Sequence, residues 1–189
     1  MEALFKNHFG VTFDVKNRPC LDSEFMPVLL FNRAFLKTAK KPVSIAVERA
    51  SGQMAVYHTF VHGTPEMAQA DRYYVNRLVK TALWMKGGFK IYVSDEGVYQ
   101  AMKGDFCTGG CQDFDFDYMA NVFEHPFEIV LTDNIPEEKD SPKAMGGHLK
   151  GCRIGFDAGG SDRKVSAVID GETVYSEEVV WFPKTNSDP

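Results

Sequence analysis

The residues with the clearest chemical potential lie near the C-terminus, in a short segment that combines an acid, two glycines, a hydroxyl and a lysine. They are Asp157, Gly159, Gly160, Ser161 and Lys164. Glycines let a backbone reach positive φ and approach a ligand without interference from a Cβ atom, and the amides of such a turn can converge on an anion. The aspartate could hold a metal ion beside a phosphate, directly or through water. The alternative is an ordinary hairpin with a glycine turn and one solvated aspartate.

Three strands are predicted to position this segment. Residues 153–156 form a short apolar strand, and residues 164–169 form a second strand rich in β-branched side chains. An Asp-Gly pair at 170–171 is a strong hairpin signal, and residues 173–182 form the return strand. The sequence therefore predicts a three-stranded antiparallel meander with the glycine turn at one end.

The run from Ile154 to Ser161, followed by Lys164, resembles the first phosphate motif of the actin, hexokinase and Hsp70 ATPase superfamily. That motif reads apolar-Gly-apolar-Asp-x-Gly-Gly-Thr/Ser, then a strand, an Asp-Gly turn and another strand. The likeness is nearest to the ROK group of sugar kinases and NagC-like regulators, with the BadF-type ATPases as neighbours. It covers residues 153–181 and departs from the ROK pattern at Ser161, usually a threonine, and at the inserted charges of residues 162–163.

This resemblance implies a site for ATP and Mg²⁺ in an intact actin-like enzyme. The turn amides and Ser161 would hold the terminal phosphates, Asp157 would hold the metal, and Lys164 would add positive charge. It also implies a sugar as the substrate of phosphoryl transfer. Such a reaction needs two half-domains, because a second phosphate hairpin, a general base and the adenosine pocket must come from elsewhere.

Only residues 182–189 follow Trp181 at the end of the predicted meander. We therefore expect an N-terminal fragment of a longer ROK-like sugar kinase or ATPase, inactive without its C-terminal half. One alternative is a NagC-like, sugar-responsive transcriptional regulator without its own DNA-binding domain, since no helix-turn-helix pattern precedes Pro42. Another is a structural or interaction module that forms a homodimer through its C-terminal strands, because exposed strands invite pairing.

Composition excludes several other classes. The 189 residues carry a net charge of −5, so no overall positive field would attract nucleic acid. No run of 18 apolar residues suggests a membrane span, and the N-terminus lacks the pattern of a signal peptide. With four cysteines in a chain of this length, a disulfide scaffold is not expected and a cytoplasmic location is.

Upstream of the meander the hydrophobic pattern alternates between strand and helix periods. We predict strands at 10–16, 43–48, 53–61, 89–94 and 127–132, and helices at 29–38, 67–86, 98–102 and 115–124. This order predicts an α/β domain with a mixed sheet over residues 1–134, its role unknown. Residues 135–151, rich in proline, glycine and charge, form a predicted linker, and residues 152–189 form the start of an actin-like (ribonuclease-H-like) ATPase domain.

Two other groups of residues could bind metal. Cys107 and Cys111 could form half of a zinc site completed by Cys152 or His148. The paired spacing typical of zinc sites is absent, so we expect thiols without zinc. Acids at 95–96 and at 113, 115 and 117 could gather a cation, but helix capping and solvation account for them more simply.

Overall fold

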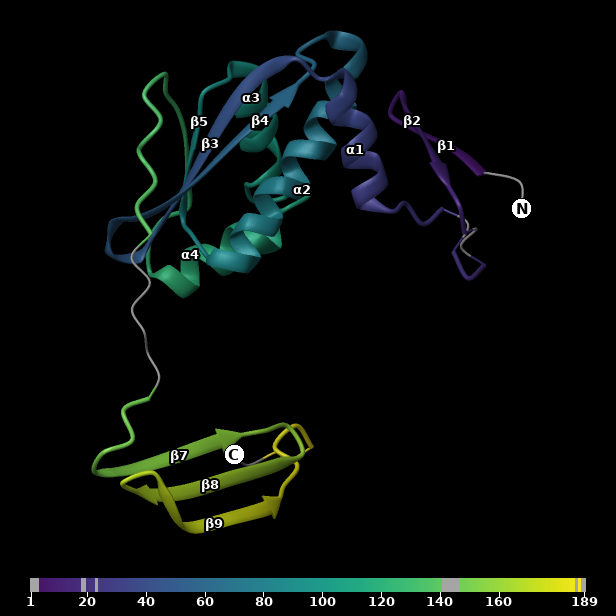
Figure 1. Cartoon of the computed structure of the whole chain (residues 1–189). Coiled ribbons are helices and arrows are strands. Elements are labelled where there is room, and N and C mark those ends of the chain that lie inside the picture. Colours follow the sequence, from purple (N-terminus) through teal and green to yellow (C-terminus); the bar gives the residue numbers. More distant parts are fainter. Residues whose placement is uncertain (1–3, 18–19, 23, 141–146, 186, 188–189) are drawn as a thin grey trace. The chain divides into compact units, whose positions relative to one another are not determined.

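A computed structural model of the chain divides into two compact units, Met1–Ser141 and Pro142–Pro189 (Figure 1). The structure describes residues 4–17, 20–22, 24–140, 147–185 and 187. The boundary lies within the predicted linker, yet the first residues of that linker are fixed to the first unit. Lys139 forms an antiparallel bridge with Met54, and the carboxylate of Asp140 lies 2.7 Å from the guanidinium of Arg49.

In its described residues, the first unit combines a hairpin, a sheet and four α-helices. Its elements are β1 (Leu4–His8), β2 (Val11–Val15), α1 (Val28–Thr38), β3 (Lys41–Arg49), β4 (Gln53–Val61), α2 (Ala68–Lys86), β5 (Lys90–Val93), α3 (Glu96–Asp105), α4 (Asp113–Phe123) and β6 (Glu128–Leu131). The sheet has the order β4-β3-β5-β6, and only β5 and β6 run parallel. The predicted mixed sheet of an α/β domain is confirmed.

One face of this sheet carries the core. Val43, Ile45 and Val47 alternate along β3 and are buried, as the two-residue period of a strand requires. The helices add apolar stripes, with Phe31 and Phe35 of α1 fully enclosed. The largest buried side chains are Phe31, Phe35, Ile45, Leu83, Ile91, Met102, Val43, Val47, Val61, Val75, Val79 and Val93. Within the described part of the chain, no helix is long and apolar enough to cross a membrane.

Each of the four predicted helices forms, with one or both ends displaced by one to three residues, and local contacts explain the starts of α3 and α2. α3 begins at Glu96, two residues earlier than predicted, because the Asp95 carboxylate accepts a hydrogen bond from the Val98 amide at 2.9 Å. α2 begins at Ala68, one residue later than predicted, because a 3₁₀ turn, Pro65–Met67, precedes it. α2 ends at Lys86, as predicted, and the glycine that follows it, Gly87, has a φ of 78°.

The second unit is the predicted meander. Its strands are β7 (Cys152–Ala158), β8 (Asp162–Ile169) and β9 (Glu172–Val180), antiparallel and in sequence order. Asp170 and Gly171 turn between β8 and β9 with φ of 51° and 91°, as an Asp-Gly hairpin requires. The Asp170 carboxylate also accepts a hydrogen bond from the Gly151 amide at 2.7 Å, which anchors the start of β7. The structure thus confirms a three-stranded antiparallel sheet.

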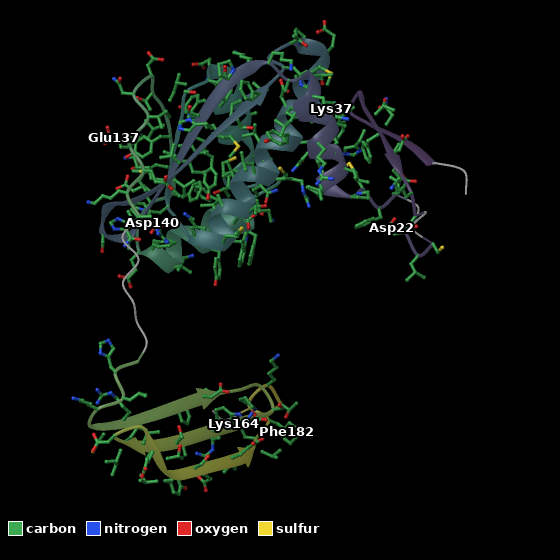
Figure 2. All side chains as sticks on the ribbon, viewed as in Figure 1. Asp22, Lys37, Glu137, Asp140, Lys164 and Phe182 are labelled. Carbon is green, nitrogen blue, oxygen red and sulfur yellow. The ribbon has the colours of Figure 1, made fainter. Side chains whose placement is uncertain are left out.

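No described side chain of the second unit is buried. Figure 2 shows the side chains of this unit standing on a single sheet. Ile154 is 80% exposed and Phe156 is 62% exposed. The register aligns Ile154 with Ala167 and Ala167 with Tyr175, so these side chains share one face. That face is an apolar surface with no cover from the described residues of the unit.

Candidate phosphate-binding turn

A row of charged side chains crosses the sheet of the second unit next to its glycine turn. The register pairs Asp157 of β7 with Lys164 of β8, and Lys164 with Glu178 of β9. Directly paired residues point to the same side of a sheet, and this row is one residue out of phase with the apolar row through Ile154. The charged face and the apolar face are therefore opposite sides of the same sheet.

The ammonium group of Lys164 is held between carboxylates. Its Nζ lies 3.4 Å from the Asp162 carboxylate and 3.9 Å from Oε1 of Glu178. The hydrogen bond to Asp162, helped by the charges of Asp162, Glu178 and Asp157, raises the pKa of Lys164. The lysine is therefore fully charged at neutral pH, as a phosphate ligand must be.

Trp181 fixes the turn from the far end of the meander. Its indole Nε1 donates to the carbonyl oxygen of Gly159 at 2.7 Å, and its backbone N–H donates to the carbonyl of Ser161 at 3.0 Å. The turn is thus tied at two points to the residue that follows β9. Sequence reasoning did not assign this residue a role. The signal available in the sequence was a tryptophan at the end of a predicted strand, because an indole N–H usually needs a hydrogen-bond partner.

The expected use of the two glycines is wrong in one respect. Neither Gly159 nor Gly160 adopts the positive φ that the sequence suggested, whereas Gly171 does. A Cβ added to Gly159 would lie 2.6 Å from the backbone oxygen of Asp162. The chain itself therefore excludes a side chain at Gly159, because the turn closes tightly on the first residue of β8. At Gly160 the nearest atom, Cε of Lys184, is 3.9 Å from the added Cβ.

A cation bound by Asp157 would need most of its other ligands from another molecule. Among the described residues, no group of three or more His, Cys, Asp or Glu side chains is placed to hold a metal ion. Mg²⁺ commonly binds one or two carboxylates together with substrate phosphates and waters. Asp157 fits that role, with a nucleotide supplying the other oxygens.

The cysteines considered for zinc have other partners in the first unit. Cys111 Sγ donates to the Asp105 carboxylate at 3.2 Å, and Cys107 Sγ donates to the Gly104 carbonyl at 3.5 Å. Burial, together with the adjacent Asp105 charge, raises the pKa of the Cys111 thiol. In this arrangement the Cys111 thiol acts as a hydrogen-bond donor to Asp105.

The acids of α4 are likewise used in structure. Asp115 is 1% exposed and accepts hydrogen bonds from Lys80 Nζ at 2.8 Å and Trp84 Nε1 at 2.6 Å. These bonds join α4 to α2. The expected solvation of Asp115 is therefore wrong, because its carboxylate is buried and binds two side chains of α2.

No known family matches the chain, and neither the curated proteins nor the solved structures contain a significant match to it. The functional interpretation of the turn rests on its own residues and geometry.

Proposed function

We propose that the turn between β7 and β8 binds the terminal phosphates of Mg-ATP as the first phosphate hairpin of an actin-like ATPase domain of the ROK type. Asp157 holds the metal, the turn amides and Ser161 hold phosphate oxygens, and Lys164 adds charge. The observation that carries the proposal is the register that sets Asp157 beside Lys164 at the mouth of the glycine turn. A carboxylate that can bind the metal and an ammonium group that can bind the phosphate then lie side by side.

The clamp by Trp181 supports this assignment. A loop that binds an anion through backbone amides gains affinity when its shape is set before the ligand arrives. The bonds from Trp181 to Gly159 and Ser161 supply that order without using an amide of the turn itself as a donor. The backbone N–H groups of Gly160 and Ser161 therefore remain available to a ligand.

In this proposal the sheet contributes only part of a sugar kinase. A second half-domain would supply the other phosphate contacts and the general base, and the apolar face through Ile154 and Phe156 would lie against it. We further propose a cytoplasmic setting, because Cys107, Cys111 and Cys152 form no disulfide.

Isothermal calorimetry with Mg-ATP tests the proposal. The wild-type chain should bind Mg-ATP, and Asp157→Ala should abolish the Mg²⁺ dependence of that binding. Glu177→Ala, which removes an exposed acid from β9 on the other face, is the matched control and should bind as wild type. Absence of Mg-ATP binding by the wild type, or unchanged binding by Asp157→Ala, would contradict the assignment.

A second candidate function is an interaction module that forms a homodimer. The favouring observation is the apolar face itself, with Ile154 80% and Tyr175 51% exposed along one row. Light scattering after size exclusion should then show a dimer that Ile154→Lys converts to a monomer, while Asp157→Ala leaves it intact. A wild-type chain that stays monomeric at all concentrations would rule out this candidate.

A further inference from the structure

Several loops of the first unit lie together at one end of the strands of its central sheet. β4 and β5 both run antiparallel to β3, so they point the same way, and β6 runs parallel to β5. The C-terminal ends of β4 and β5 therefore lie at the same edge as Lys41, the first residue of β3. In open α/β sheets, ligands bind outside the C-terminal ends of the strands.

A cavity of about 530 Å³ opens at this edge. Its volume falls in the range of about 300–1,000 Å³ that small-molecule sites occupy. Its apolar lining comes from β4, α2 and α3 and consists of Val61, Ala68, Val75, Val98, Ala101 and Met102. A ligand here would bury an apolar body against two helices and the end of a strand.

The two carboxylates that line the cavity are already committed to the protein. Asp71 accepts hydrogen bonds from the backbone and ring of His62, both at 2.9 Å, and from the Gly63 amide at 2.7 Å. Asp95 accepts from the Val98 amide and lies 2.5 Å from Nζ of Lys41. Burial acts to raise the pKa of Asp95, but the bonds from Lys41 and Val98 outweigh it and hold that pKa below its usual value. Neither acid is left to attract a cation.

Two basic side chains on the cavity wall retain donors. The Lys41 side chain is 49% exposed, and an ammonium group has three N–H donors, of which Asp95 takes one. Arg72 has five N–H donors; Nε and Nη2 contact the Asp105 carboxylate and the guanidinium also interacts with Cys111, so at least two donors remain. Both residues line the cavity. The donors that remain at this site therefore favour an anion.

Gly63 gives Lys41 the room to reach this position. Its φ is +70°, and a Cβ added there would lie 2.6 Å from Cδ of Lys41. The lysine stem therefore crosses the loop after β4 at the one residue that has no side chain. Both the backbone conformation and the crossing select glycine.

We propose that this cavity binds a small organic anion, a monocarboxylate with an apolar tail. The carboxylate group contacts Lys41 and Arg72, and the tail lies against Val75, Val98 and Met102. The site belongs to the first unit alone and does not depend on the phosphate-binding function of the second.

Hexanoate is a suitable probe, and hexanol, which has the same apolar tail without the charge, is the matched control ligand. Titrated into the full chain and followed by amide NMR, hexanoate should shift the resonances of Gly63, Gly97 and Val98. Hexanol should bind at least tenfold more weakly, because it cannot form charge-assisted bonds with the two cations. Absence of shifts at these amides, or equal binding of hexanoate and hexanol, would overturn the proposal. Because the comparison uses the wild-type chain, it does not depend on any variant folding.

Variants then test the named cation. Lys41→Met removes the charge while keeping an apolar stem, and it should weaken hexanoate binding about tenfold. Gly63→Ala keeps the charge of Lys41 but displaces its side chain, and this variant should also bind hexanoate more weakly than the wild type. Lys37→Met removes an exposed lysine of α1, labelled in Figure 2, and should bind as wild type. Unchanged binding by a folded Lys41→Met protein would remove this residue from the site and overturn the proposal.

Discussion

The two units of this chain use the same kinds of residues in opposite ways. In the first unit Phe31 and Phe35 are completely enclosed by residues distant in sequence, whereas Phe156 in the second is 62% exposed. The second unit satisfies its backbone within a local meander, so its strands can pair without any buried interior. Strand pairing in the second unit therefore needs only short turns between neighbouring strands. Burial of side chains, as in the first unit, needs a second layer of structure against the sheet.

That separation determines where each unit draws its stability. A three-stranded sheet needs an apolar face packed on something to be stable independently, while the first unit already has its core. Each unit also contains one of the two tryptophans, Trp84 in the first and Trp181 in the second. The unfolding of each unit can thus be followed separately in the whole chain.

The largest expected effect separates the two phenylalanine environments. Phe35→Ala should destabilise the first unit by about 3–5 kcal/mol, because it leaves a cavity in a closed core. The Phe35 ring lies 4.4 Å from that of Tyr74, 4.7 Å from that of His62 and 5.9 Å from that of Phe31 between centroids, so three further side chains lose contacts. Urea unfolding, followed by Trp84 fluorescence in a Trp181→Phe background, measures the change.

Phe156→Ala is the counterpart in the second unit. Followed by Trp181 fluorescence in a Trp84→Phe background, it should change stability by no more than about 0.5 kcal/mol, as expected for an exposed side chain. A loss comparable to that of Phe35→Ala would contradict the comparison. It would mean that the Phe156 face is covered in solution, and the concentration dependence of the loss would tell whether a second copy covers it.

Removal of the buried charge of the first unit should cost less stability than Phe35→Ala. Asp105 is fully buried and accepts hydrogen bonds from Arg72, from Asn76 at 2.9 Å and from Cys111. Asp105→Asn removes the charge that these donors surround and should cost about 2 kcal/mol, in the range for charge-assisted bonds. Asp117→Asn, on the exposed side of α4, is the matched control and should leave the urea midpoint unchanged.

The Asp105 carboxylate also predicts how the stability of the first unit changes with pH. Burial acts to raise the pKa of Asp105, but the bonds from Arg72, Asn76 and Cys111 hold it below its usual value. Because the folded pKa is below the unfolded one, the contribution is complete above about pH 4 and is lost as pH falls through the folded value. The stability difference between wild type and Asp105→Asn should therefore shrink in acid. A difference that is constant down to pH 2 would exclude Asp105 as its source.

The sequence predicted the elements where short-range signals agree. β4 matches its predicted bounds, and α2 ends at the predicted residue, Lys86, because strand alternation and helix periodicity are both local patterns. β1 was not predicted, since its five residues show no alternation and it is defined by pairing with β2. The exposure of Ile154 and Phe156 also could not be predicted, because burial depends on what a face packs against.

The candidate site shows the same limit. The order of strand, glycine turn and strand was visible in the residue types, and the register then set Asp157 beside Lys164. The conformation of Gly159 was not predictable, because its constraint is the carbonyl oxygen of Asp162 rather than its own φ. The cavity near Lys41 was missed for a similar reason. Its residues come from β3, β4, α2 and α3 and meet only when the sheet forms.

The indole bond that orders the glycine turn is expected to contribute less than the buried Asp105 carboxylate. Trp181→Phe removes the indole N–H that donates to Gly159 at 2.7 Å while keeping an aromatic ring at the end of β9. Loss of one such bond is worth about 1 kcal/mol, so the backbone amide of residue 181, which donates to the Ser161 carbonyl at 3.0 Å, should exchange with solvent about fivefold faster. Phe182→Leu, which changes an exposed neighbour, is the control and should leave exchange unchanged. Equal exchange in both variants would show that the turn is held by its own backbone. The preorganisation argued for phosphate binding would then have to come from the tight closure at Gly159 alone.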